Sequence, residues 1–308
     1  MAILLDTHLF EAGADDKLRH LIMYIARAGK YINHALQTGD LGLAGSSNLF
    51  GEHQLALDVL ADEIIEENLM ICRLVKAAIS EEKEDVVHCK CKGEDCGGKY
   101  AVAYDPLDGS SLVETNLAVG SIFSIMEGDE FMGRTGREQV AALYMVYGPR
   151  TTLVYTVGKG VHEFTLNDVG EFHLTNENIK LGETTKHFAP GNLRAGNINK
   201  KYQELINSYM ENEYTLRYSG GMVPDINHML LKREGIFTYP ANPPRYPEGK
   251  LRLLFECNPF SFLIEQAGGA SSNGHIPVMD MEIESLHQRT PIYLGSKLEV
   301  EKAVKALK

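Results

Sequence analysis

The chain is predicted to adopt a layered fold of the mixed α/β (α+β) class, for three reasons. Segments with helical spacing of apolar residues alternate with short runs rich in β-branched and aromatic residues. This alternation occurs in both halves of the 308 residues. Polarity rises at residues 180–186, so we expect two fused subdomains, one at 1–185 and the other at 186–308.

Helices are predicted where apolar residues recur at intervals of three and four. The first has Asp15 or Asp16 as its N-cap, and a loop rich in glycine and serine follows it at 39–51. On the next helix Asp58 and Asp62 are one turn apart, which is typical of a solvated helix face. Helices are expected at 15–36, 52–69, 138–144, 199–210, 222–232, from 259 or 260 to Gly268-Gly269, and after Ser296.

Strands are predicted where short β-branched and aromatic runs are bounded by turn formers. The polar, glycine-containing segment 83–98 is expected to form a projecting hairpin. In the run 250–255, Lys250 and Arg252 alternate with apolar residues and are expected to point outward. Strands are expected at 71–75, 101–104, 117–126, 151–157, 160–166, 171–174, 236–239, 250–255 and 291–294.

Charge and cysteine content bear on partners and location. Lys and Arg number 30 against 42 Asp and Glu, a net charge of −12. This charge argues against nucleic acid and anionic membranes as general partners. No apolar run reaches membrane-spanning length, and the first residues lack a basic leader. An odd count of five cysteines does not suit a disulfide framework, so a cytoplasmic protein is expected.

The segment Asp105-Pro106-Leu107-Asp108-Gly109-Ser110-Ser111 is the strongest candidate for a functional site. It follows a short buried strand, and two carboxylates three residues apart on a turn can converge on a hard cation. The N–H groups of Gly109, Ser110 and Ser111 can cradle an anion beside that cation. A metal next to a phosphate indicates metal-assisted phosphoryl chemistry, and a surface turn of ordinary turn formers is the alternative.

Three further acids extend this candidate site. Glu81 and Glu82 are adjacent and carry like charges that repel each other, so a bound cation would stabilise the pair. Glu256 ends an apolar run, and a buried carboxylate needs a partner. Oxygen ligands of this kind suit Mg²⁺.

Basic and aromatic residues of the second half suit a sugar phosphate. Arg217-Tyr218 precedes the backbone donors Gly220-Gly221, and Tyr239 lies upstream of Lys250 and Arg252. Each of these features alone is weak evidence, because arginine and lysine are ordinary surface residues.

Several long motifs in one order resemble class 1 fructose-1,6-bisphosphatase, from about residue 28 to the C-terminus. The motif Asp-Pro-x-Asp-Gly-Ser at 105–110, taken alone, would also fit inositol monophosphatases. The motifs are residues 80–82 (SEE), 105–111 (DPLDGSS), 235–242 (GIFTYPAN), 250–259 (KLRLLFECNP) and 286–289 (LHQR).

The resemblance implies a five-layer αβαβα sandwich of the sugar-phosphatase type, assembled as a homotetramer. It also implies Mg²⁺-dependent hydrolysis of the 1-phosphate of fructose 1,6-bisphosphate, a reaction of gluconeogenesis and Calvin-type sugar phosphate metabolism. Two or more Mg²⁺ ions per subunit are implied, with Mn²⁺ as a substitute. The metal-ligand positions are Glu81, Glu82, Asp105, the carbonyl of Leu107, Asp108 and Glu256.

The resemblance also assigns roles in catalysis and substrate binding. Glu82, Asp58 and Glu63 fall at catalytic positions, the latter two where the family has acids thought to help activate the attacking water. Arg217 is implied to reach the site of a neighbouring subunit. The substrate-binding positions are Asp108, Gly109, Ser110, Ser111, Asn192, Arg194, Arg217, Tyr218, Gly220, Gly221, Met222, Tyr239, Lys250 and Arg252.

Two departures from the usual family pattern concern the substrate. Residues 112–116 (LVETN) replace the usual Asn-Ile-Asp, and residues 190–194 (PGNLR) replace the usual Asn-Glu-Gly-Tyr of the distal-phosphate loop. The second form resembles sedoheptulose-1,7-bisphosphatase, as do residues 147–152 and 217–225. Activity on both bisphosphates is therefore the working hypothesis, with fructose bisphosphate as the main substrate.

The AMP site of the family is matched only in part. Lys99, Tyr100 and Arg137 stand at its effector positions, while Ala14 and Leu18 replace the threonines that hold the phosphate. Weak or absent AMP inhibition is therefore expected.

Two readings outside this enzyme class stay open at this point. His88, Cys89, Cys91 and Cys96 lie within nine residues and could bind zinc in a structural or interaction module, or Cys96 could form a redox switch with Cys89 or Cys91. An exposed reduced loop is the simplest reading. A non-catalytic protein that binds a sugar phosphate is the second alternative.

Overall fold

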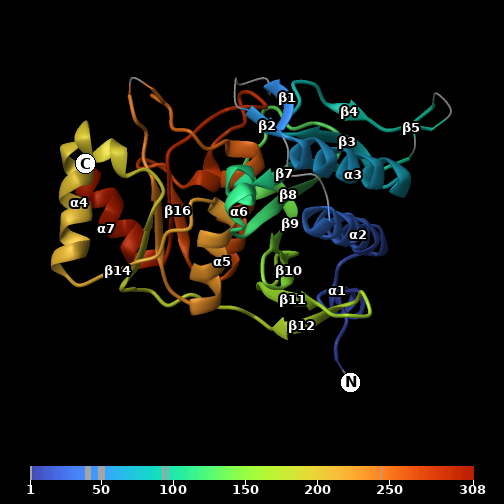
Figure 1. Ribbon diagram of the computed structural model, residues 1–308, viewed down its shortest axis with the longest axis horizontal. Helices are drawn as coiled ribbons and strands as arrows, with labels where there is room; N and C mark the ends of the chain where they lie inside the picture. Colours follow the sequence, from blue (N-terminus) through green and yellow to red (C-terminus); the bar gives the residue numbers. More distant parts are fainter. Residues whose placement is uncertain (1, 39–42, 48–52, 92–93, 96, 244) are drawn as a thin grey trace.

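Two β-sheets and three helical layers alternate across the computed structural model, which describes residues 2–38, 43–47, 53–91, 94–95, 97–243 and 245–308. From right to left in Figure 1 lie a helical layer, a large sheet, a second helical layer, a smaller sheet and a third helical layer. The predicted five-layer αβαβα sandwich is confirmed. No helix in the described ranges has both the length and the apolar character needed to cross a bilayer.

The first helical layer covers one face of the large sheet. Leu21, Ile22 and Ile25 recur at helical spacing and bury one side of the long helix α2 against the sheet. The side chain of Asp15 accepts a hydrogen bond from the Leu18 N–H at 2.8 Å, as predicted for the N-cap. The helices of this layer are α1 (Leu5–Glu11), α2 (Asp16–Thr38) and α3 (Ala56–Cys72).

The large sheet is antiparallel except for one pair, β3 with β7. In spatial order its strands are β12 (Phe172–Asn176), β11 (His162–Leu166), β10 (Thr151–Thr156), β9 (Gln139–Tyr147), β8 (Val119–Glu127), β7 (Tyr100–Asp108), β3 (Val75–Ser80) and β4 (Val87–His88). The separate short pairs are β1 (Leu43–Ser47) with β2 (His53–Leu55) and β5 (Lys90–Cys91) with β6 (Glu94–Asp95). The second pair lies in the predicted hairpin.

The second half supplies the remaining three layers. Helices α5 (Met222–Lys232) and α6 (Asn258–Gln266) lie between the sheets, and α4 (Lys200–Glu211) and α7 (Lys297–Leu307) cover the outer face of the small sheet. The small sheet has the order β14 (Thr215–Leu216), β13 (His187–Pro190), β15 (Ile236–Tyr239), β17 (Ile292–Gly295) and β16 (Ala270–Ser272).

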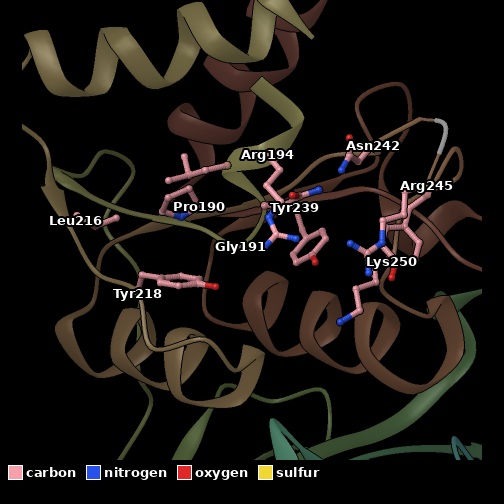
Figure 2. Close-up of a pocket in the computed structure, with 12 residues that line it drawn as sticks. Pro190, Gly191, Arg194, Leu216, Tyr218, Tyr239, Asn242, Arg245 and Lys250 are labelled. Carbon is pink, nitrogen blue, oxygen red and sulfur yellow. The ribbon is translucent and has the colours of Figure 1, made fainter. Parts of the chain in front are cut away.

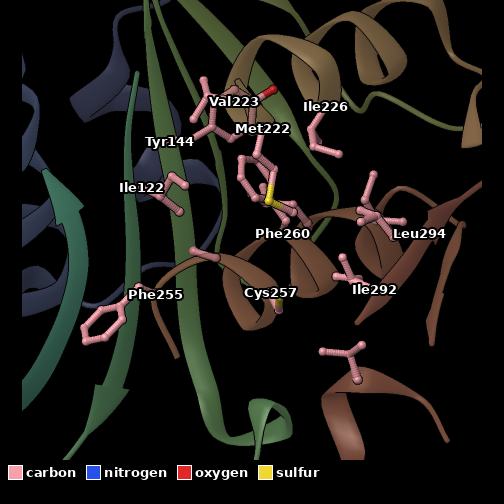
Figure 3. Close-up of a cluster of buried hydrophobic side chains, with 14 of the residues drawn as sticks. Ile122, Tyr144, Met222, Val223, Ile226, Phe255, Cys257, Phe260, Ile292 and Leu294 are labelled. Carbon is pink, nitrogen blue, oxygen red and sulfur yellow. The ribbon is translucent and has the colours of Figure 1, made fainter. Parts of the chain in front are cut away.

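The core between the sheets joins both halves of the chain (Figure 3). Ile122 and Tyr144 from the large sheet face Val223 of α5 and Phe260 of α6, and Leu294 of the small sheet closes the far side. Burial of such side chains contributes about 1.5–3 kcal/mol each. The site residues on α5 and near α6 are therefore held against the large sheet by a continuous apolar core.

Four predictions about local structure are wrong. Residues 139–147 form strand β9 instead of a helix, because the strand is covered on both faces and its continuous apolar run has no alternation. Residues 71–75 are not a strand, since α3 ends at Cys72 and β3 begins at Val75. Residues 253–257 form a π-helical turn instead of a strand. Asp58 and Asp62 do not lie on a solvated face; both are buried.

Candidate active site

Three buried carboxylates from the two halves of the chain form an acidic cluster. Asp105 and Asp108 stand at the end of β7, and Glu256 stands in the π-helical turn η4 (Leu253–Cys257) just before α6. One carboxylate oxygen of each lies within 4.8 Å of the others. This spacing allows one hard cation to contact all three acids.

The end of β7 is shaped so that both of its acids reach the cluster. The pairing with β8 shifts register between Asp105 and Asp108, around Pro106, which has no N–H to donate. Asp105 Oδ1 accepts a hydrogen bond from the Leu107 N–H at 3.0 Å, and the Ser121 hydroxyl donates to the Pro106 carbonyl at 2.7 Å. The turn is therefore fixed before any ligand binds.

The first turn of α5 approaches the same turn from the second half. The Val223 N–H donates to Asp108 Oδ2 at 2.6 Å. Gly109 has a φ of 78°, a left-handed conformation that glycine adopts without strain. A Cβ placed on Gly109 would lie 3.5 Å from the Gly221 Cα, so two glycine-containing loops meet here and bring their backbones close to the acids.

Burial and mutual repulsion weaken the acidity of the cluster. Burial, followed by the charges of Asp108, Glu256 and Glu82, raises the pKa of Asp105 well above its usual value. Burial raises the pKa of Asp108 to about 6 and that of Glu256 to about 7. Carboxylates held together in this way are stabilised by a bound divalent cation. The donor set, with oxygen atoms only, therefore fits a hard metal ion.

Glu81 and Glu82 follow β3 and line the same cavity. Arg252 is only 4% exposed, forms an ion pair with Glu81, and donates its backbone N–H to Glu256 Oε2 at 2.6 Å. The predicted outward orientation of Arg252 is therefore wrong, because the chain turns into η4 instead of continuing as a strand. Arg252 connects an acid of the first half to an acid of the second.

A cavity of about 490 Å³ opens over the cluster and contains most of the predicted site. Asn192 and Arg194 instead line an adjoining cavity of about 350 Å³ (Figure 2). Arg217 is exposed, and it is not among the described residues that line either of these two cavities. The predicted residues around the larger cavity are Glu81, Glu82, Asp105, Leu107, Asp108, Gly109, Ser110, Ser111, Tyr218, Gly220, Gly221, Met222, Tyr239, Lys250, Arg252 and Glu256.

The two predicted catalytic acids of α3 lie apart from this lining. Asp58 is buried and Glu63 is exposed, and neither lines the cavity that the described residues form. Asp62 between them accepts a hydrogen bond from the Tyr104 hydroxyl at 3.0 Å and pairs with Lys83 at 2.7 Å. The loop predicted at 39–51 lies largely outside the described residues.

Sequence reasoning missed two kinds of lining residue. Arg245 and Tyr246 line both cavities, and Asp225 lines the larger one. Burial raises the pKa of Asp225 to about 6, and this acid accepts a hydrogen bond from the Ser219 N–H at 2.7 Å. The proline-rich segment between Tyr239 and Lys250 could have indicated Arg245, because binding residues often lie on loops that a rigid scaffold positions.

The residues at the effector positions make ion pairs of their own. Lys99 pairs with Asp15 and Glu127, and the Tyr100 hydroxyl donates to Asp15 at 2.9 Å. Arg137 pairs with Glu265 and Asp280 in the second half of the chain. A ligand at Lys99 would therefore compete with carboxylates that are already in place.

The cysteine-containing hairpin is described only in part. Cys72, Cys89 and Cys257 form no disulfide within the described part of the chain. Cys89 and Cys257 are buried, and Cys72 is half-buried. Cys96 lies outside the described residues, so zinc binding and a Cys96 redox switch stay untested predictions.

Comparison with known proteins places this geometry in a family. Residues 2–177 match the family described as Fructose-1-6-bisphosphatase, N-terminal domain, and residues 181–308 match Fructose-1-6-bisphosphatase, C-terminal domain. The chain is 52% identical to the Fructose-1,6-bisphosphatase class 1 of Citrifermentans bemidjiense, over 96% of this chain and 89% of that protein. It is 44% identical to the chloroplastic Sedoheptulose-1,7-bisphosphatase of Spinacia oleracea, over 98% of this chain and 77% of that protein.

Solved structures agree with the sequence relatives. A putative sedoheptulose-1,7 bisphosphatase from Toxoplasma gondii superposes with a TM-score of 0.92 at 35% identity, covering 99% of this chain and 98% of the other. Leishmania major fructose-1,6-bisphosphatase in holo form also gives 0.92, at 32% identity, covering 99% of both chains. The resemblance inferred from the motifs is confirmed: the chain belongs to the class 1 fructose-1,6-bisphosphatase family.

Proposed function

We propose that the chain is a phosphoric monoester hydrolase that converts fructose 1,6-bisphosphate to fructose 6-phosphate and inorganic phosphate. The observation that carries this proposal is the cluster of Asp105, Asp108 and Glu256 in a cavity that also contains Arg245 and Lys250. A cavity that combines acids with cations suits a substrate with a reacting phosphate and a distal phosphate. The class 1 relatives at about half identity support the same reaction.

We propose Mg²⁺ as the resident metal, two or more ions per subunit, with Mn²⁺ as a substitute. The ligands would be Glu81, Glu82, Asp105, the Leu107 carbonyl, Asp108 and Glu256. When bound, such ions offset phosphate charge, acidify a water and stabilise the leaving oxygen. The support from the structure is that these residues line one cavity and that Asp105, Asp108 and Glu256 share a cluster.

The chain's own groups would bind and orient the phosphate that is removed. The N–H groups of Gly109 and Ser110 and the Ser110 hydroxyl would hold it, with Ser111 on the rim of the cavity. The first turn of α5, beginning at Met222, faces the same place and favours negative charge. Gly220 and Gly221 let the two loops approach closely.

The sugar and its distal phosphate would be held at the other end of the cavity. Lys250, Tyr218 and Tyr239 line this end, and Asn192 and Arg194 lie beyond it. Arg252 is assigned a different role: its guanidinium orients Glu81, and its N–H orients Glu256. Arg217, which is exposed, stays a proposed contact to the site of a neighbouring subunit in a homotetramer.

Activation of the attacking water is assigned to acids near the cluster. Glu82 lines the cavity and is the first candidate. Asp58 and Glu63 stay proposed contributors on the family resemblance alone. The division into 1–185 and 186–308, and weak AMP inhibition through Lys99, Tyr100 and Arg137, are likewise proposals. Two strand boundaries support the division of the chain. Strand β12 of the large sheet ends at residue 176, and strand β13 of the small sheet begins at residue 187.

Sedoheptulose 1,7-bisphosphate is a second candidate substrate, supported by the Spinacia oleracea and Toxoplasma gondii relatives. The test is phosphate release from fructose 1,6-bisphosphate, sedoheptulose 1,7-bisphosphate and inositol phosphate, each with Mg²⁺ and with EDTA. Release from a ketose bisphosphate that EDTA abolishes supports the proposal. Release only from inositol phosphate, or equal rates in EDTA, would contradict it.

A further inference from the structure

We propose that the cavity beside the acidic cluster holds the distal phosphate at two depths, and that Arg194 and Arg245 set the length of ketose bisphosphate that is accepted. This inference rests on the proposed function, because it assumes that the other phosphate of the same substrate lies at the acidic cluster.

The two cavities adjoin and share part of their lining. Tyr218, Tyr239, Arg245 and Lys250 line both of them, whereas Arg194 lines only the cavity farther from the acids. In Figure 2 the side chains of Arg194, Arg245 and Lys250 reach the space around Tyr239. A substrate anchored at the acids therefore meets Lys250 and Arg245 first and Arg194 last.

Backbone hydrogen bonds position the loop that carries Arg245. Asn242 and Tyr246 each donate a backbone N–H to the other's carbonyl at 2.8 Å, which closes a tight turn with Arg245 in it. The Arg245 guanidinium lies 5.3 Å from the centre of the Tyr246 ring, a cation–π contact. The cation is therefore presented on an anchored turn.

Arg194 stands in the short 3₁₀ turn η3 (Leu193–Asn197) that follows β13. Just before it, the side-chain amide of Asn192 donates to the Pro240 carbonyl at 3.4 Å. Because Pro240 directly follows β15, this bond ties the Arg194 turn to the base of the loop that holds Arg245. The backbone positions from which the two arginines extend are therefore tied to each other by the fold.

Neither Arg194 nor Arg245 has a carboxylate within 4.0 Å among the described residues. Arg19, Arg134 and Arg137, by contrast, each form an ion pair with an acid. In a protein with a net charge of −12, two arginines without an acid partner that face one cavity form a local positive site. The planar guanidinium suits the oxygens of a phosphate dianion.

The length of the substrate decides which cation the distal phosphate reaches. One additional carbon moves that phosphate by about one bond length, roughly 1.5 Å. This is more than the roughly 0.5 Å range of a good hydrogen bond. A single cation at one depth would therefore reject the longer sugar. We assign the phosphate of a six-carbon substrate to Lys250 and Arg245, and that of a seven-carbon substrate to Arg245 and Arg194.

The test compares kcat and KM for fructose 1,6-bisphosphate and sedoheptulose 1,7-bisphosphate in wild type, Arg194→Ala, Arg245→Ala and Arg194→Lys. Loss of a charge-assisted hydrogen bond should raise KM about 10-fold. For Arg194→Ala we expect this rise only with the seven-carbon substrate, and for Arg245→Ala with both. kcat should not change, because neither residue touches the acids, and Arg194→Lys should recover part of the loss. Arg150→Ala, which removes an exposed arginine outside both cavities, should leave both KM values unchanged.

Thermal unfolding of each variant checks that it is folded. Equal KM changes with both substrates in Arg194→Ala, or no change with either, would overturn the two-depth assignment. Absence of wild-type activity on the seven-carbon substrate would overturn it as well. A wild type that is inactive on both substrates with Mg²⁺ would instead overturn the proposed function, so the two failures are distinguishable.

Discussion

The backbone N–H of Val223 donates a hydrogen bond to Oδ2 of Asp108 at 2.6 Å, which joins the first turn of α5 to an acid of β7. The Val223 side chain also packs against Gly120 of β8, next to that acid. An acid of the buried cluster is thus oriented by an element from the other half of the chain. Any change that moves α5 away from the sheet should therefore affect catalysis as well as stability.

Gly120→Ala tests this connection. A Cβ at this position would lie 2.2 Å from the Met145 carbonyl oxygen and 2.4 Å from Val223 Cγ1, so both the β8–β9 pair and α5 must shift. We expect the free energy of unfolding to fall by about 1–3 kcal/mol and kcat to fall with it. Urea denaturation and phosphate release measure the two effects. Gly182→Ala, whose Cβ meets its nearest atoms at 3.6 Å, is the matched control and should change neither. A normal kcat in Gly120→Ala would show that α5 does not orient Asp108.

Asp108→Asn removes one charge of the acidic cluster while its shape is kept. We expect kcat to fall by about 100-fold or more, as it does when a single charge-stabilising group is lost from other enzymes. Stability should stay near the wild type in EDTA, because burial already raises the pKa of Asp108. Phosphate release and thermal unfolding give the two readouts. A protein that only binds sugar phosphates would have no turnover to lose.

Arg252→Met tests how much the ion pair between Arg252 and Glu81 contributes to stability. Removing one partner of a buried pair leaves a charge without its partner and costs about 3–5 kcal/mol. We expect the loss in thermal stability to be smaller in saturating Mg²⁺ than in EDTA, since a bound cation would replace the guanidinium beside Glu81. Arg19→Met, which removes a more exposed pair with Asp6, should cost less than about 1 kcal/mol. An equal loss for Arg252→Met in both buffers would argue against a metal near Glu81.

His162 makes stability depend on pH. Burial lowers its pKa, and its Nδ1 accepts a hydrogen bond from the Asn178 N–H at 3.1 Å, which requires the neutral ring. His8 and Lys180 add positive charge nearby, which Glu177 opposes. The lowered pKa means that the unfolded chain binds a proton more readily, so stability falls as pH drops below about 6.5. His162→Gln should make the unfolding free energy less dependent on pH between 7 and 5.

The control for this prediction is His275→Gln, which changes an exposed histidine. Its pH dependence should follow the wild type. If His162→Gln loses stability with falling pH as steeply as the wild type does, other groups carry the effect.

The acids of the site could be found from the sequence because they are concentrated in short motifs. Asp105 and Asp108 are local to one turn, and Glu256 stands at the end of an apolar run. The orientation of Arg252 could not be found in this way. Alternation with Leu251 and Leu253 indicates a strand, but the partner that draws Arg252 inward is Glu81, which is remote in sequence. A contact between two residues that are far apart in the sequence produces no pattern in the sequence around either of them.

Strand β9 illustrates a second limit. Its residues are covered by helices on both faces of the sheet, so the alternation that marks a half-exposed strand is absent. A short apolar run of this kind is compatible with a buried helix as well. Arg245 illustrates a third limit, since its place beside Tyr239 depends on a turn closed by Asn242 and Tyr246.

The distribution of the acidic cluster over both halves has a consequence for biosynthesis. Asp105 and Asp108 leave the ribosome well before Glu256 and the helix that holds Asp108 in place. Domains tend to fold as they are synthesised, the N-terminal one first. The large sheet can therefore form while the acidic cluster at its end still lacks its third acid. If the cluster is the catalytic centre that we propose, a nascent chain should be inactive until Glu256 has emerged and joined the two acids of β7.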